Sequence, residues 1–113
     1  MELHIETRTR ENAHIIDIKG DVDLYSSPQM RKCIFKTIKQ HHPANLIVEL
    51  SRVTYMDSSG IATLVEGLQL SDEYHTRLKL VGPSQAVLEV FQLSRLEGAF
   101  TMYTTEDDAF RDT

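Results

Sequence analysis

The stretch Tyr55-Met56-Asp57-Ser58-Ser59-Gly60-Ile61 places an acid, two hydroxyls and a glycine between two apolar segments of different period. The run from Asn45 to Leu50 before it is almost continuously apolar, as in a strand that is covered on both faces. In the run from Ile61 to Tyr74 after it, apolar residues recur at helical spacing. The stretch is therefore predicted to lie where a buried strand ends and a helix begins.

A helix N-terminus has unpaired backbone N–H groups and a partial positive charge, so it suits phosphate and other anions. A serine at this point can cap the helix, hold an anion or accept a phosphoryl group. Loops before helices also favour Asp, Ser and Gly for capping and backbone reasons, so the tetrapeptide Asp57 to Gly60 is weak evidence when taken alone. The rest of the sequence is needed to distinguish a simple helix cap from an anion-binding or phosphorylated serine.

Length and composition predict one domain over residues 1–113, because the chain has the usual size of a domain and is 41% hydrophobic. Its 12 Lys and Arg against 17 Asp and Glu give a formal net charge of −5. No cluster of Lys and Arg stands out, which argues against a nucleic-acid partner. The single cysteine, Cys33, excludes an internal disulfide. With no signal-peptide pattern and no apolar run near the ~18 residues of a membrane span, we expect a cytoplasmic protein without membrane insertion.

Hydrophobic periodicity predicts the element order β-β-α-β-α-β-α-β-α. A hairpin is expected first, with strands at residues 3–7 and Ala13 to Lys19 around a turn at Glu11-Asn12. A helix should begin at Ser26-Ser27-Pro28 and end near Gln40. The later β-α-β units imply parallel pairing, so the fold class is a mixed sheet with an antiparallel start, a parallel middle and helices mainly on one face. The later elements are strands at Leu46 to Leu50, Leu78 to Val81 and Phe100 to Tyr103, and helices at residues 61–74, after Gly82-Pro83-Ser84 and after Thr105.

Two acidic turns end neighbouring segments of the predicted sheet. The stretch Gly20-Asp21-Val22-Asp23-Leu24 follows the second strand, and Met56 to Gly60 follows the third. If these strands are neighbours, both turns open at the carboxyl edge of the sheet, where α/β proteins bind ligands. Two acids beside a helix-capping serine would suit a partner that bears Mg²⁺, Arg or Lys. No group of His, Cys or acidic residues has the spacing of a metal site.

Taken in order, these motifs resemble a STAS domain of the anti-sigma factor antagonist (anti-anti-sigma factor) type, over almost the whole chain. The resemblance rests on the hairpin with its Gly20-Asp21-Val22-Asp23 turn, the apolar strand that ends in Tyr55 to Gly60, and the segment from Leu93 to Phe100. One departure is Ser26-Ser27-Pro28, because the family commonly has Thr-Ala before its first helix.

The resemblance implies a non-enzymatic switch protein. In antagonists of this family the second serine of the motif, here Ser59, is phosphorylated by an anti-sigma factor that is an ATP-bound kinase of the histidine-kinase-like ATPase fold. Unphosphorylated, such a protein binds the kinase and frees its client sigma factor, and a PP2C-type phosphatase restores this state. No cofactor, metal or catalytic residue is implied. The expected partner surface comprises Asp23, Asp57, Ser58, Gly60, Thr63, Glu66 and Gly67, the last three on or near the exposed face of the helix.

Three other classes of protein were weighed. A serine hydrolase would need a Gly-x-Ser-x-Gly elbow, but Met56 takes the place of the first glycine. A receiver domain would use Asp57 as its phosphoacceptor, but it opens with a strand and a helix, whereas this chain opens with a predicted hairpin. A STAS subunit that serves as a scaffold, in a stressosome-type or membrane transport complex, remains open as the alternative.

Overall fold

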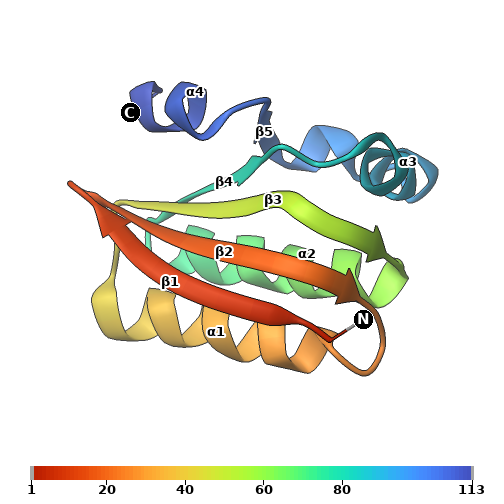
Figure 1. The fold of residues 1–113 in the computed structure, drawn as a ribbon. Coiled ribbons are helices and arrows are strands. Elements are labelled where there is room, and N and C mark those ends of the chain that lie inside the picture. The colour runs from red at the N-terminus through yellow and green to blue at the C-terminus, as the bar shows by residue number, and fades with distance from the viewer. Residues whose placement is uncertain (1, 113) are drawn as a thin grey trace.

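The computed structural model describes residues 2–112, which form one five-stranded sheet with the spatial order β1-β2-β3-β4-β5 (Figure 1). The strand β1 pairs antiparallel with β2, and every later neighbour pairs in parallel. This arrangement confirms the mixed sheet. The elements are β1 (His4–Arg10), β2 (Ala13–Val22), α1 (Ser27–His41), β3 (Asn45–Met56), α2 (Ser58–Glu73), β4 (Arg77–Val81), α3 (Gln85–Leu93), the 3₁₀ turn η1 (Glu97–Ala99), β5 (Thr101–Tyr103) and α4 (Glu106–Arg111).

The helices lie mainly on one face of the sheet, as predicted. Figure 1 shows α1 and α2 below the sheet and α4 above it. The helices α1, α2 and α3 share one apolar cluster with the strands, to which they contribute Ile34, Leu64 and Phe91, each with 0% exposure. None of the helices within residues 2–112 combines the length and the apolar character that crossing a membrane requires.

Two strands are longer than the sequence pattern predicted. The strand β2 runs to Val22 instead of Lys19, and β3 runs to Met56 instead of Leu50. Their pairing contains register shifts that break the two-residue alternation. After Leu50, the buried residues of β3 are therefore Val53 and Met56, three apart instead of two. The extra length places the ends of both strands side by side.

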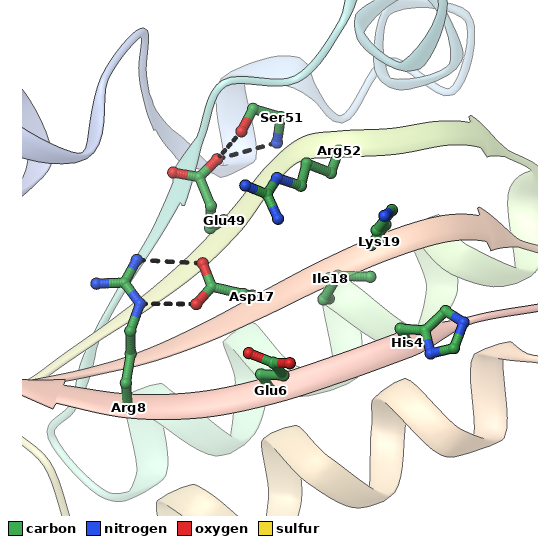
Figure 2. A pocket seen from close by; sticks show the side chains of 9 residues that line it. All are labelled: His4, Glu6, Arg8, Asp17, Ile18, Lys19, Glu49, Ser51 and Arg52. Carbon is green, nitrogen blue, oxygen red and sulfur yellow. Dashed lines mark hydrogen bonds and ion pairs between the residues drawn. The ribbon is translucent and has the colours of Figure 1, made fainter.

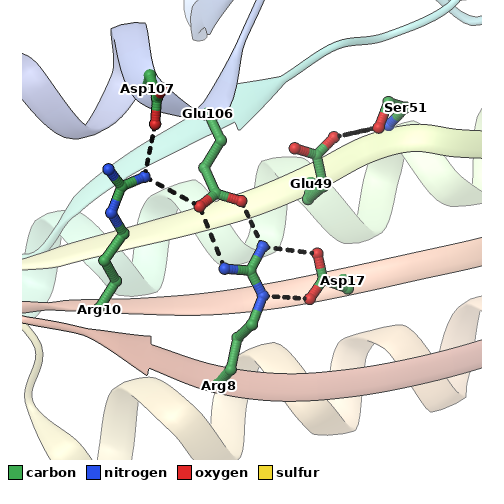
Figure 3. Close-up of polar contacts among 7 residues, drawn as sticks. All are labelled: Arg8, Arg10, Asp17, Glu49, Ser51, Glu106 and Asp107. Atoms are coloured by element: carbon green, nitrogen blue, oxygen red, sulfur yellow. Dashed lines mark hydrogen bonds and ion pairs between the residues drawn. The ribbon is translucent and has the colours of Figure 1, made fainter.

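The opposite face of the sheet is partly covered by α4, whose Ala109 lies in a small apolar cluster with Ile15 and Ile47. An ion network, here called the α4 ion network, ties this helix to β1 and β2 (Figure 3). Its members are Arg8, Arg10, Asp17, Glu106 and Asp107, with Arg8 Nε 2.7 Å from Asp17 Oδ2 and Arg10 Nη1 2.8 Å from Asp107 Oδ1.

A buried lysine holds the C-terminal end of α4. Lys79 is only 1% exposed, and its Nζ donates to the carbonyl oxygens of Ala109, at 2.7 Å, and Asp112. Burial lowers the pKa of Lys79, since removing water penalises its charged form. Carbonyl groups at the end of a helix lack intrahelical partners and carry partial negative charge, so the ammonium group complements them.

Candidate functional site

The two acidic turns lie at the same edge of the sheet, as the sequence predicted. The strands β2 and β3 are parallel neighbours, and Val22 pairs with Met56 at their ends. The backbone N–H of Asp57 donates to the carbonyl oxygen of Val22 at 3.1 Å, which joins one turn to the other. Residues 20–26 and 55–60 are here called the Ser59 edge.

Asp57 and Ser59 form the start of α2. Asp57 is the N-cap residue, and its Oδ1 accepts a hydrogen bond from the backbone N–H of Ser59 at 2.9 Å. The Ser59 hydroxyl donates to the same carboxylate oxygen. Ser59 is half-buried, whereas Ser58 is exposed. The Ser59 hydroxyl is thus oriented by a carboxylate at a helix N-terminus.

Asp23 organises the other turn of the Ser59 edge. Its Oδ1 accepts hydrogen bonds from the backbone N–H groups of Tyr25 and Ser26, both at 2.9 Å. The hydrogen bond from the Ser26 N–H is the largest cause of the lowered pKa of Asp23, and the Tyr25 N–H also lowers it. Ser26 precedes α1 but makes no side-chain cap bond to it, and its hydroxyl donates to the carbonyl oxygen of Asp21 at 2.8 Å.

A third carboxylate lies close by on β2. The Thr54 hydroxyl donates to Asp21 Oδ1 at 2.6 Å and lowers the pKa of Asp21. The Ser59 edge is therefore strongly anionic, with acids at positions 21, 23 and 57. Within residues 2–112, no three His, Cys, Asp or Glu side chains are grouped so that they could hold a metal ion.

Gly60 has a packing role that the sequence did not reveal. It is buried, and a Cβ atom at this position would lie 2.7 Å from Met56 Cγ and 2.9 Å from Val22 Cγ1. The first turn of α2 can therefore lie close against the ends of β2 and β3 only because Gly60 has no side chain. The prediction that Gly60 contributes to the partner surface is not supported by its burial, which leaves it little surface for a partner to contact.

Thr63 and Gly67 were predicted on or near the exposed face of the helix, and the structure shows that both are buried. Thr63 is 5% exposed and Gly67 is buried, with space at Gly67 so limited that a Cβ would lie 3.1 Å from Ile34 Cγ2. The absence of a side chain at Gly67 lets α2 lie close to Ile34 of α1. Glu66 is exposed as predicted, and its Oε2 lies 3.1 Å from Arg31 Nε of α1.

Three large side chains at the Ser59 edge are exposed, and the sequence reading did not count them in the partner surface. Leu24 is 66%, Tyr25 90% and Tyr55 52% exposed. Each lies next to one of the acidic turns. For Leu24 and Tyr25 the sequence held a signal, since large side chains in a turn have no strand or helix face that could bury them. Tyr55 is the residue before the last of β3, and its exposure follows from the register shifts in that strand. Exposed apolar groups beside charged ones are typical of protein interaction surfaces.

The hollow in Figure 2 is distinct from the Ser59 edge. It has a volume of about 350 Å³ and lies over β1, β2 and β3, on the face opposite α1 and α2. It is lined mainly by charged side chains, among them Glu6, Asp17 and Arg52, and by no residue of the two acidic turns. The Ser59 edge consists of exposed turns and a helix start, which suits a protein partner.

Comparison with known proteins agrees with this geometry. The STAS domain family model matches residues 4–109. An anti-sigma-B factor antagonist of Staphylococcus aureus is 27% identical over 97 residues, which cover 86% of this chain and 89% of that protein.

Solved structures show the same fold. An anti-sigma factor antagonist from Mycobacterium paratuberculosis superposes with a TM-score of 0.89 at 20% identity, covering 97% of this chain and 92% of that one. The anti-sigma factor antagonist SpoIIAA in its unphosphorylated form gives 0.79 at 26% identity, with 96% and 95% covered. The phosphorylated form of SpoIIAA, a Bacillus cell fate determinant, gives 0.73 at 24% identity, with 97% and 100% covered. Because the family model spans the sheet from its first strand to its last helix, the chain belongs to the STAS domain family.

Proposed function

We propose that the protein is an anti-sigma factor antagonist that changes partners when Ser59 is phosphorylated. Without phosphate, it binds an ATP-bound anti-sigma factor kinase through the Ser59 edge, so that the kinase releases its client sigma factor in the cytoplasm. A PP2C-type phosphatase reverses the modification. The protein is the substrate of these enzymes and not itself an enzyme. The observation that carries the proposal is the Ser59 hydroxyl, oriented by Asp57 at the start of α2 beside the Asp23 turn.

Known relatives support this function. The S. aureus relative is an anti-sigma-B factor antagonist, and SpoIIAA has been solved in both an unphosphorylated and a phosphorylated form. A protein of the same fold and class therefore exists in the two states that the proposal requires.

The choice of Ser59 over Ser58 rests on the family motif and fits the local geometry. Ser59 donates to Asp57, so its oxygen lies within the anionic turn, whereas Ser58 is more exposed. If the Ser59 hydroxyl turns outward, it loses a hydrogen bond to a charged carboxylate, at a net cost of about 1.5–3 kcal/mol. The binding energy of a docked kinase can readily supply this amount.

A phosphate on Ser59 would change the surface more than the fold. It adds a charge of about −1.5 to −2 beside two carboxylates, Asp23 and Asp57. The helix N-terminus partly offsets this repulsion. The buried residues of α2, Ile61 and Leu64, face the sheet and are not part of the Ser59 edge. Phosphorylation should therefore oppose docking of a partner that had matched the unphosphorylated edge.

The exposed side chains of the Ser59 edge define the partner surface in this proposal. Leu24, Tyr25 and Tyr55 are the apolar anchors, and the carboxylates of Asp23 and Asp57 provide charge for Arg, Lys or a nucleotide-bound Mg²⁺ on the kinase. Tyrosines are among the residues that contribute most to protein interfaces. In this proposal Gly60, Thr63 and Gly67 act indirectly, by setting the position of α2.

The test is phosphorylation by a cognate kinase with ATP, followed by intact-mass measurement of three proteins. Wild type and Ser58→Ala should gain one phosphoryl group, and Ser59→Ala should gain none. Ser59→Ala should still bind the kinase, which separates loss of the acceptor from loss of docking. Equal phosphorylation of Ser59→Ala and wild type contradicts the assignment of the acceptor.

Binding of the two forms tests the switch itself. The phosphorylated protein should bind the kinase at least about tenfold more weakly, a difference of about 1.4 kcal/mol. Its circular dichroism spectrum should stay the same. Equal affinity for both forms would instead support the alternative, an interaction subunit of a larger STAS assembly.

A further inference from the structure

The helix α1 is basic in an otherwise acidic protein. It contains Arg31, Lys32, Lys36 and Lys39 and no Asp or Glu, whereas the whole chain has a net charge of −5. These residues form no long run in the sequence. The helix gathers them along its exposed sides.

The two exposed sides of α1 differ in how their charges are compensated. Towards α2, Arg31 pairs with Glu66, and its guanidinium lies 4.1 Å from the centre of the Phe35 ring. Towards β1, Lys32 and Lys36 form no ion pair with any acidic group in residues 2–112. Like charges four residues apart on a helix repel each other. Within the described part of the chain, Lys32 and Lys36 are thus two cations without an ionic partner on the side of α1 that lies towards β1.

These two lysines line a groove between α1 and β1, here called the α1–β1 groove. Its volume is about 490 Å³, and Ile5 and Thr7 of β1 also line it. Within residues 2–112, β1 is an edge strand, with β2 on one side and no strand on the other. The outward backbone groups of such an edge can pair with an added strand.

The spacing of the lysines matches an extended chain. Lys32 and Lys36 are separated by about 6 Å along the helix axis, since each residue rises about 1.5 Å. Side chains on one face of a strand recur at about 6.6 Å. Figure 1 shows α1 running beneath β1 in the same direction, and the groove is lined by both. A strand added to β1 would therefore present alternate side chains to the two lysines.

We propose that the α1–β1 groove binds an extended acidic segment of a partner protein. The segment adds to the open edge of β1 as a strand, and carboxylates at alternate positions pair with Lys32 and Lys36. Binding by strand addition takes its affinity from backbone hydrogen bonds and its specificity from alternate side chains. The groove contains no residue of the Ser59 edge, so this inference does not depend on the proposed phosphorylation switch.

The test uses short synthetic peptides and the full chain labelled with ¹⁵N. In one peptide Glu alternates with Val, and in the second the same residues are regrouped so that all Glu are adjacent. The alternating peptide should shift the amide resonances of β1 and bind at least about tenfold more tightly than the regrouped one. A third peptide, with N-methyl groups on the N–H groups that would face β1, should not bind.

A matched pair of variants tests the role of the lysines. Lys36→Glu should weaken binding of the alternating peptide at least about fivefold. Lys39→Glu makes the same charge change on the same helix, but Lys39 lies near the Phe35 ring and outside the groove lining, so binding should change less than about twofold. Thermal melts should show that both variants fold.

Three results with the peptides and variants would overturn the proposal. They are absence of binding at millimolar peptide, equal binding of the regrouped peptide, and equal weakening by Lys36→Glu and Lys39→Glu, since the last would indicate only long-range attraction. Binding of a single-stranded oligonucleotide to the groove without binding of the peptide would also overturn it and assign the groove to nucleic acid.

Discussion

The two faces of the sheet are built from alternate residues of the same strands, yet different forces hold the helices that cover each face. On the face covered by α1, α2 and α3, the packing is apolar, and Leu46, Leu64 and Phe91 belong to its buried cluster. On the opposite face, a helix of six residues is held by a small apolar cluster, by Lys79 and by the α4 ion network. Apolar packing responds little to pH and salt, whereas charged contacts respond to both.

The apolar face forms the core of the molecule, and α4 is attached to the opposite face mainly by charged contacts. The Ser59 edge rests on the core, because α2 begins at Ser58 and buries Ile61 and Leu64 against the sheet. The helix α4 lies on the other face and shares no contact residue with that edge among the residues described above. We therefore expect changes to the core to affect global stability and changes around α4 to act locally.

The largest effect should come from the apolar face. Leu64→Ala removes a side chain with 0% exposure and should lower the free energy of unfolding by about 2–5 kcal/mol, measured by urea denaturation. Leu93→Ala is the control, since Leu93 is also in a helix but is 85% exposed, and its effect should stay within about 0.5 kcal/mol. Similar losses in both variants would contradict the burial pattern.

The next effect concerns the lysine below α4. Lys79→Met keeps the length of the side chain but removes the donor to the carbonyl oxygens of Ala109 and Asp112. Leaving such buried acceptors unpaired should cost about 1–3 kcal/mol. Hydrogen exchange should show faster exchange in α4, while amides of α2 keep their protection.

A uniform change in exchange across α2 and α4 would mean that α4 is part of the core. Lys36→Met is a suitable control because it also removes an ammonium group, but from an exposed position. It should leave exchange in α4 unchanged.

Sequence reasoning was most successful for elements with a clear period. The hairpin and the helices after Ser84 and after Thr105 were predicted. The structure adds that the side chains of Ser84 and Thr105 cap these helices by accepting the backbone N–H groups of Val87 and Asp108. The end of β3 was missed, because a register shift moves its buried residues out of simple alternation. A pattern read from sequence cannot locate such a shift, since its position depends on the neighbouring strand.

The site was predicted in part for similar reasons. Parallel neighbours bring Asp23 and Asp57 to one edge, and this follows from strand order alone. Thr63 and Gly67 were misplaced because a small residue on a helix can mark either an exposed position or a close contact with another helix. Only the packing of α1 on α2 decides between these meanings. The burial of Lys79 was equally hidden, since a lysine on a short strand usually faces solvent.

Acid should weaken the attachment of α4 before it affects the core. The hydrogen bond from Arg8 is the main reason that the pKa of Glu106 is lowered. A carboxylate whose pKa is lower in the folded state stabilises the fold above its unfolded pKa, and this contribution is lost as pH falls through the folded pKa. At neutral pH, Glu106→Gln should therefore lower the free energy of unfolding by about 1 kcal/mol or less, since the network is partly exposed.

The difference between wild type and Glu106→Gln should shrink as the pH is lowered below about 4, the usual range of Glu. Urea denaturation at several pH values measures it. Glu66→Gln is the control, because the Arg31–Glu66 pair is about half exposed on both sides and lies on the face of the apolar core. A difference that grows towards acid pH would have the wrong sign for this role of Glu106.

Salt should give the smallest effect and the most local one. At about 1 M NaCl the screening length falls to about 3 Å, so exposed members of the α4 ion network attract each other less. Hydrogen exchange in α4 should then quicken by a small factor, corresponding to a few tenths of a kcal/mol, because surface ion pairs contribute little. Amides of α2 should not respond, since the buried side chains of that helix are apolar or small. Lys79 should also keep its bonds, because it is buried away from the added ions. If salt loosened α2 as much as α4, the two faces would not differ in the forces that hold them.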